Sequence, residues 1–201
     1  MMEPRELVAF AEAAVDQVEP IFRSGLGAAP ARFKGQGDFA TEVDLVIEKQ
    51  LREILTQVTG IPVYGEESGG SVLDTVWVVD PIDGTANYSA GNPMAGILVA
   101  LIHESAPIAA VSDFPLLERR LVTCDDSPLR SVGGPAAGFG GGQDAMGFDE
   151  ARGHVGCSSH LPTDIFHELR ETGLRPRMTG SVGLDNAFVA QGVFDLSLIH
   201  I

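Results

Sequence analysis

The sequence W-V-V-D-P-I-D-G-T-A-N-Y, residues Trp77–Tyr88, decides the fold of this chain because it joins an apolar run to a tight polar turn. The run Val76–Val79 is short and β-branched, which predicts a buried β-strand that ends at Asp80. Pro81 has no backbone N–H, so we expect it to stop the hydrogen-bond ladder there. The strand therefore delivers Asp80 and, three residues on, Asp83 to one turn.

This turn supports two interpretations. The carboxylates of Asp80 and Asp83 can share hard divalent cations, which take oxygen ligands, while the N–H groups of Gly84 and Thr85 can hold an anion. Alternatively, the turn is an Asx-type turn in which the two Asp side chains only cap backbone groups. The turn by itself leaves both interpretations open, and its neighbours favour the first.

A second motif, G-E-E at Gly65–Glu67, lies upstream of D-P-I-D-G-T-A-N-Y. With these two motifs in this order and spacing, the chain resembles the inositol monophosphatase family of metal-dependent, lithium-sensitive sugar phosphatases. The resemblance covers about residues 34–195. It implies an α/β layered fold, the αβαβα sandwich of the sugar phosphatases, and Mg²⁺ as the cofactor.

The resemblance also implies a set of metal ligands. Glu66, Asp80 and the carbonyl oxygen of Ile82 would bind a first ion, and Asp80 and Asp83 a second. Mg²⁺ suits such hard ligands because it keeps several waters and uses few carboxylates. Two divalent ions about 3.5–4 Å apart can clamp the attacking and leaving oxygens of a phosphate ester.

By the same resemblance, Thr85 pairs with Asp44 to orient and deprotonate the attacking water, and Glu67 binds a metal-bound water. Each residue also has a non-catalytic interpretation. Asp44 could simply be an acidic residue in the first turn of a helix, where the helix dipole favours it, and Glu67 could be an exposed charge at the rim of the site. The resemblance further implies that Lys34 and Asp38 belong to a lid that supports a third, weaker ion, although their spacing is one residue shorter than in familiar members.

A third segment, Gly180-Ser181-Val182, opens a helix of small and apolar residues. The resemblance implies that its N-terminus contacts the substrate, together with Asp83, Gly84 and Thr85. An ordinary N-cap is the alternative.

Periodicity and turn residues predict the remaining elements. A Gly/Ala-rich break is expected at residues 25–37, a surface loop at 127–147, a first part over residues 1–125 and a second over 126–201. The expected helices cover residues 3–23, 39–59, 163–172 and 182–191, and the expected strands cover 61–64, 96–103, 107–112, 119–123 and 153–157.

Composition limits the class of protein. The formal charge of −15, from 13 basic and 28 acidic residues, argues against nucleic acid as a partner. Cys124 and Cys157 show no paired spacing, which favours a reduced, cytoplasmic protein; Cys157 near His160 could be a nucleophile, but a small buried thiol is the better interpretation. We expect neither a secretory signal nor a membrane span.

The C-terminal end is unexpected for the family. After Asp195 a member would continue to a Trp-Asp motif that supplies a metal-binding carboxylate, whereas this sequence closes with Leu196–Ile201. These six residues match the translation of a transposase end sequence used in sequencing libraries. We therefore expect a non-native tail on a truncated C-terminal part; a natural short strand is the alternative. A complete chain would form a homodimer.

The sequence thus predicts a Mg²⁺-dependent hydrolase of a small phosphate monoester, inositol monophosphate or a related polyol or sugar phosphate. Fructose 1,6-bisphosphate and histidinol phosphate stay open as substrates. The alternative is an inactive family member that only binds metal or a phosphorylated ligand, since the last metal ligand lies outside the sequence.

Overall fold

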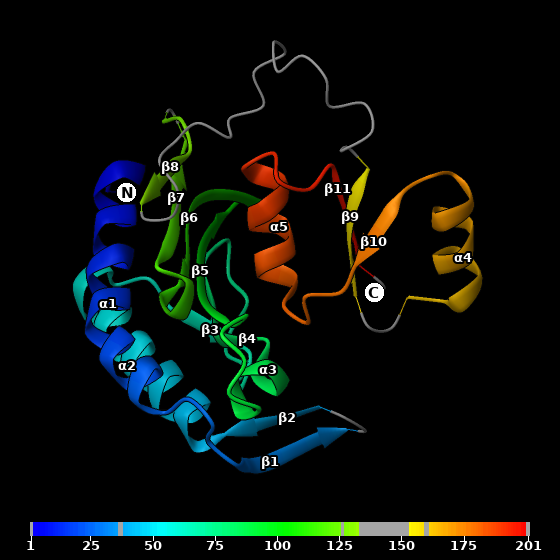
Figure 1. Cartoon of the computed structure of the whole chain (residues 1–201). Coiled ribbons are helices and arrows are strands. Elements are labelled where there is room, and N and C mark those ends of the chain that lie inside the picture. The colour runs from blue at the N-terminus through cyan, green and yellow to red at the C-terminus, as the bar shows by residue number, and fades with distance from the viewer. Residues whose placement is uncertain (1, 36–37, 126, 133–152, 159–160, 200–201) are drawn as a thin grey trace. The chain divides into compact units, whose positions relative to one another are not determined.

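The computed structural model describes residues 2–35, 38–125, 127–132, 153–158 and 161–199 (Figure 1). The chain divides into two compact units, Met1–Gly134 and Pro135–Ile201. The first unit holds the predicted metal and catalytic residues, and the second holds Gly180-Ser181-Val182.

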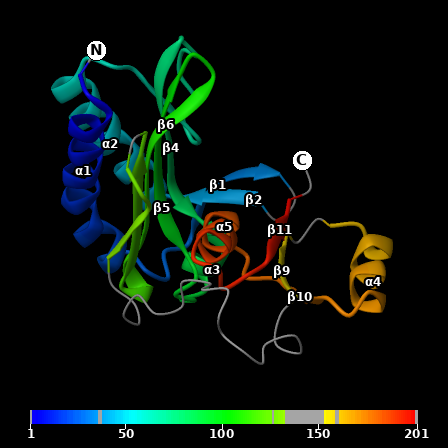
Figure 2. The same cartoon turned by 90° about the horizontal axis from the view of Figure 1, so that it is seen from above.

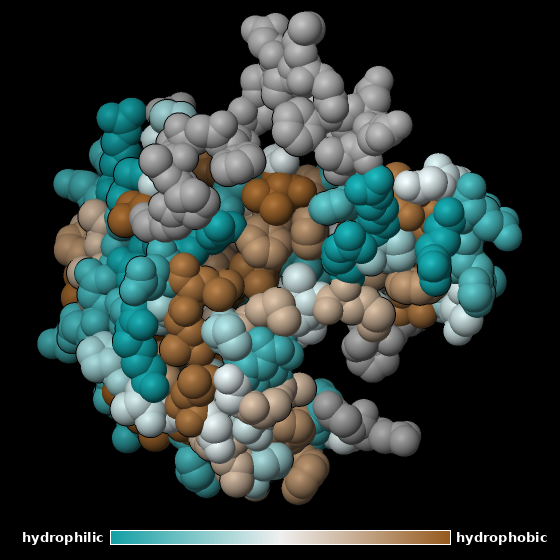
Figure 3. All heavy atoms as spheres, viewed as in Figure 1, coloured by the Kyte–Doolittle hydropathy of each residue, from teal (hydrophilic) through white to brown (hydrophobic). Residues whose placement is uncertain are grey.

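Two long helices, α1 and α2, form one layer of the first unit. α1 spans Pro4–Ser24 and α2 spans Glu42–Thr59, close to the predicted ranges. α2 begins at Glu42 rather than at residue 39, because Thr41 caps it and accepts a hydrogen bond from the backbone N–H of Val43 at 3.1 Å. The side of α1 turned away from the sheet is mostly hydrophilic (Figure 3).

A six-stranded sheet forms the other layer, in the order β3-β4-β5-β6-β7-β8. β3 and β4 are parallel, and every other neighbouring pair is antiparallel. The short helices α3 (Thr85–Ser89) and η1 (Pro115–Leu117) follow β4 and β6. The strands are β3 Val63–Gly65, β4 Thr75–Asp83, β5 Gly96–His103, β6 Ala106–Phe114, β7 Arg119–Cys124 and β8 Arg130–Val132.

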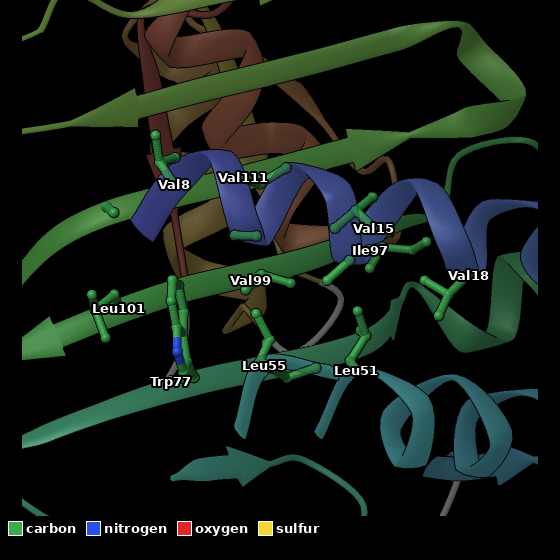
Figure 4. Close-up of a cluster of buried hydrophobic side chains, with 14 of the residues drawn as sticks. Val8, Val15, Val18, Leu51, Leu55, Trp77, Ile97, Val99, Leu101 and Val111 are labelled. Carbon is green, nitrogen blue, oxygen red and sulfur yellow. The ribbon is translucent and has the colours of Figure 1, made fainter. Parts of the chain in front are cut away.

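The core of the first unit lies between the helices and one face of this sheet. α1 and α2 lie side by side on that face (Figure 2). Figure 4 shows apolar side chains of α1, α2 and the strands meeting there, with Trp77, Leu51 and Leu55 among them. Trp77 is fully buried, and its indole N–H donates to the hydroxyl of Thr59 at 3.1 Å. Burial of this kind contributes roughly 25 cal/mol per Å² of apolar surface.

Two further details differ from the sequence-based expectations. The expected break at residues 25–37 contains β1 (Pro30–Gly35), which pairs with β2 (Asp38–Thr41) as an antiparallel hairpin. All six residues of β1 are exposed, so it carries no alternating pattern that a sequence could reveal. β4 also continues past Pro81 to Asp83, with an irregular register between Asp80 and Asp83 that accommodates the missing donor.

The second unit contains a three-stranded parallel sheet in the order β10-β9-β11, with helices α4 and α5. The layered α/β class is confirmed in each unit. The glycine-rich run Gly133–Gly142 lies outside the described residues, and the origin of the tail stays a prediction. The elements are β9 His154–Cys157, α4 Thr163–Glu171, β10 Arg175–Arg177, α5 Val182–Ala190 and β11 Leu196–Leu198.

Candidate active site

The end of β4 positions the first two predicted ligands. Asp80 Oδ1 accepts a hydrogen bond from the backbone N–H of Ile82 at 3.1 Å, which folds the turn back on itself. Gly84 has φ +82°, a left-handed conformation that side chains other than glycine rarely adopt. Gly84 is the N-cap of α3, so this helix begins at Thr85, two residues after Asp83.

Parallel pairing of β3 with β4 brings Glu66 to the same place. The backbone N–H of Glu66 donates to the carbonyl of Val79 at 3.0 Å, directly before Asp80. Burial raises the pKa of Asp80 well above its usual value, and the negative charges of Glu66 and Asp83 raise it further. A hydrogen bond between Asp80 and Glu66 acts in the same direction. Burial and the neighbouring negative charges therefore favour the protonated form of Asp80 over its carboxylate.

The predicted pair of Asp44 and Thr85 is formed. Asp44 is fully buried in the first turn of α2, and its Oδ1 lies 3.2 Å from the hydroxyl of Thr85. Its Oδ2 accepts hydrogen bonds from the backbone N–H and the hydroxyl of Thr41, at 2.8 and 2.6 Å. Burial raises the pKa of Asp44, and the hydrogen bonds from Thr41 and Thr85 oppose that rise. The hydroxyl of Thr85 also donates to the carbonyl of Ile82 at 2.9 Å.

The β1–β2 hairpin reaches this cluster through Lys34. Lys34 Nζ lies 2.7 Å from Glu66 Oε1 and 2.6 Å from Glu67 Oε1. The Glu67 side chain is only 1% exposed, and its Oε2 is buried without a hydrogen-bond partner. Burial raises the pKa of Glu67, and Lys34 opposes that rise. Asp38, the other predicted lid residue, is exposed at the start of β2.

Glu48 is a structural residue of the site that sequence reasoning missed. It is 2% exposed on α2 and accepts hydrogen bonds from the backbone N–H groups of Glu67 and Ser68 at 2.6 and 3.0 Å. Arg52 Nη2 approaches its carboxylate at 3.3 Å. A Cβ added to Gly65 would lie 2.1 Å from Glu48 Cδ, so the motif needs glycine there. The sequence did contain an indication of this burial. Glu48 lies one helical turn after Asp44, on the apolar face of α2.

In the second unit, Gly180-Ser181-Val182 forms the start of α5. Ser181 caps the helix by accepting from the backbone N–H of Leu184 at 3.1 Å. The hydroxyl of Thr179 donates to Asp185 Oδ1 at 2.7 Å, which ties the preceding turn to the helix. The N-cap interpretation is therefore confirmed, and a contact with substrate stays a prediction.

The side chains of Glu66, Asp80 and Asp83 have the right donor atoms for a divalent cation, but they are not arranged as a preformed metal site. In the part of the chain that the structure describes, no three Asp, Glu, His or Cys side chains converge as a metal site. The donor set is nevertheless all oxygen, the carboxyl groups of Glu66, Asp80 and Asp83 repel one another, and Glu67 Oε2 lacks a partner. A cation bound among these oxygens would relieve that repulsion.

Comparison with known proteins places this chain in a family. The sequence model of the inositol monophosphatase family matches residues 3–200, so the chain belongs to that family, whose members hydrolyse phosphate monoesters. A probable inositol 1-monophosphatase of Mycobacterium tuberculosis, ImpA, is 38% identical over 194 residues, 93% of this chain and 72% of the relative. ImpA of Mycolicibacterium smegmatis is 38% identical over 196 residues, 93% of this chain and 70% of the relative.

Solved structures show the same fold. The inositol monophosphatase TM1415 of Thermotoga maritima superposes with a TM-score of 0.75 at 22% identity, covering 90% of this chain and 71% of that one. The protein suhB of Bartonella henselae gives 0.78 at 20% identity, covering 94% and 76%. The expected layered sandwich is thereby confirmed. Among the described residues, no helix is long and apolar enough to cross a bilayer.

Proposed function

We propose that this chain hydrolyses the phosphate monoester of a small polyol or sugar, with Mg²⁺ as cofactor and water as nucleophile. The observation that carries the proposal is the contact of Thr85 with the buried carboxylate of Asp44, beside the interacting carboxyl groups of Glu66 and Asp80. One solved structure of similar fold is an IMPase/NADP phosphatase complexed with Mg²⁺ and phosphate.

Glu66, Asp80, Asp83 and the carbonyl of Ile82 would hold the cation, which supplies positive charge to the phosphate and makes a bound water more acidic. The chain's own groups then handle the proton. The hydroxyl of Thr85 orients the attacking water and passes its proton toward Asp44, and burial makes that carboxylate a better base.

Two further groups bind the reactants. The unpartnered Oε2 of Glu67 is available to accept a hydrogen bond from the attacking water. The backbone N–H groups of Gly84 and Thr85 hold the phosphate. The family resemblance adds Gly180, Ser181 and Val182 of the second unit to the proposed substrate-binding residues.

Inositol monophosphate is the first candidate substrate because of the two ImpA relatives. A histidinol-phosphatase of Mycobacterium tuberculosis is 36% identical over 113 residues, 54% of this chain. A fructose-1,6-bisphosphatase/inositol-1-monophosphatase of Aquifex aeolicus is 27% identical over 180 residues. These matches make histidinol phosphate and fructose 1,6-bisphosphate the two alternatives.

The test is phosphate release from these three substrates with Mg²⁺ and with EDTA. We expect release with Mg²⁺ only, loss of at least about a hundredfold in Asp80→Asn, and unchanged release in Asp74→Asn, an exposed aspartate of the same chain. Li⁺ should inhibit, as in the staphylococcal enzyme solved as a LiCl-soaked inhibitory complex. Mg²⁺ binding without release from any substrate would instead support an inactive, ligand-binding member.

A further inference from the structure

A pocket of about 330 Å³ lies at the C-terminal end of α4 and along β10, wholly within the Pro135–Ile201 unit. Its walls combine cationic and apolar side chains, and none of its lining residues is acidic. Apart from Gly173, they are Arg170, Arg175, Arg177, Phe166, Leu174 and Pro176. None of these residues belongs to the site described above.

The charge of the pocket is opposite to that of its unit. Residues 135–201 contain eight Asp and Glu residues but only four Arg and no Lys. Three of those four arginines line this one pocket. The pocket lining therefore carries a concentrated positive charge, which attracts a negatively charged ligand.

Arg170 and Arg175 lie on either side of the turn between α4 and β10, and backbone hydrogen bonds hold both in place. α4 ends in a turn in which Gly173 has φ +83° and donates to the carbonyl of Arg170 at 3.2 Å. The backbone N–H of Arg175 then donates to the carbonyl of Gly153 at 2.6 Å, which starts the pairing of β10 with β9. Arg175 and Arg177 are two residues apart on a strand, so their side chains leave the same face.

The apolar part of the wall determines the size and kind of ligand. Phe166, Leu174 and Pro176 are partly buried beside the arginines. Figure 3 shows hydrophilic and hydrophobic side chains next to each other over α4. A volume near 330 Å³ is at the lower end for small-molecule pockets. Planar guanidinium groups bind phosphate oxygens in pairs.

We propose that this pocket is a second anion site, which binds the phosphate group of inorganic phosphate or of a small phosphorylated molecule without a metal ion. The arginines hold the phosphate oxygens, and the apolar residues cover the organic part of an ester. The site goes beyond the proposed hydrolysis, because it uses neither the carboxylates nor the Asp44–Thr85 pair.

Isothermal titration calorimetry with inorganic phosphate, on the full chain in EDTA, tests the proposal separately from hydrolysis. We expect saturable binding that weakens with NaCl and is about tenfold weaker in Arg175→Gln. Arg170→Gln, on the helix, should show the same loss without touching the sheet. Arg5→Gln, an exposed arginine of the first unit, should bind like the wild type.

A parallel titration with glycerol 2-phosphate separates the two sources of phosphate. Tighter binding of the ester would show that the apolar residues contact its organic part, and equal binding would show that the phosphate group suffices. The proposal is overturned if phosphate produces no saturable heat, or if the Arg170 and Arg175 variants bind it as tightly as Arg5→Gln does.

Discussion

Replacing Lys34 by Met should show how much its ammonium group stabilises the carboxylates of Glu66 and Glu67 when no cation is bound. The Lys34 ammonium contacts two carboxylates, one of which, Glu67, is 1% exposed and has no other partner for its second oxygen. Removing one partner of a buried pair costs about 3–5 kcal/mol when the other charge stays buried and unpaired.

Two features of the structure reduce that cost. The Glu66 carboxylate is 43% exposed, so its pair with Lys34 contributes little. The pKa of Glu67 is already raised, so the carboxyl group can take up a proton instead of remaining charged. We therefore expect the Mg²⁺-free protein to lose about 2 kcal/mol, or about 4–8 °C in Tm for a chain of this length.

Mg²⁺ should affect the variant more than the wild type. The ammonium group and a cation would compete for the carboxylate of Glu66, so Lys34→Met should bind Mg²⁺ more tightly and gain more in Tm from it. Thermal unfolding with and without Mg²⁺, supported by calorimetric titration, measures both effects. Lys49→Met is the matched control, since Lys49 and Glu53 are 4.0 Å apart and 75% and 65% exposed.

Two results would refute this reasoning. An unchanged Tm in EDTA would mean that the contacts of Lys34 with the glutamates contribute nothing to stability. Weaker Mg²⁺ binding by Lys34→Met would mean that the lysine assists the cation rather than competing with it.

Gly65→Ala should lose about 2–4 kcal/mol in urea unfolding, because its Cβ would displace the buried Glu48 carboxylate from its hydrogen bonds. Gly35→Ala, where a Cβ meets nothing within 4 Å, should be nearly neutral, and equal losses in both would contradict this. Burial, followed by the charge of Asp44, raises the pKa of Tyr88 from 10.0 to about 12. The folded state then keeps a proton that the unfolded state releases, so stability should fall by about 2–3 kcal/mol between pH 10 and 12. Tyr88→Phe should lack this part of the decline; parallel curves for variant and wild type would contradict the assignment.

Local patterns predicted those parts of the site that depend on neighbouring residues. The strand leading to Asp80, the turn to Asp83 and the cap of Thr41 with Asp44 all follow from residues within a few positions of one another. The contact of Asp44 with Thr85, 41 residues apart, came from the family resemblance, and the structure confirms that the two side chains meet.

The rest of the site depends on contacts that no local pattern encodes. β1 is exposed along its length, so neither the hairpin nor the contacts of Lys34 with Glu66 and Glu67 could be predicted from alternation. Glu48 was overlooked because a charged residue on a helix is usually solvated. Its burial depends on backbone N–H groups about twenty residues further along the chain.

The most direct test of the central claim is release of phosphate from inositol monophosphate in ¹⁸O-labelled water. With Mg²⁺, the wild type should release phosphate carrying one ¹⁸O atom, since water attacks phosphorus, and Asp80→Asn should release almost none. Equal release by wild type and Asp80→Asn, or release without the label in the phosphate, would contradict hydrolysis by metal-activated water at this site.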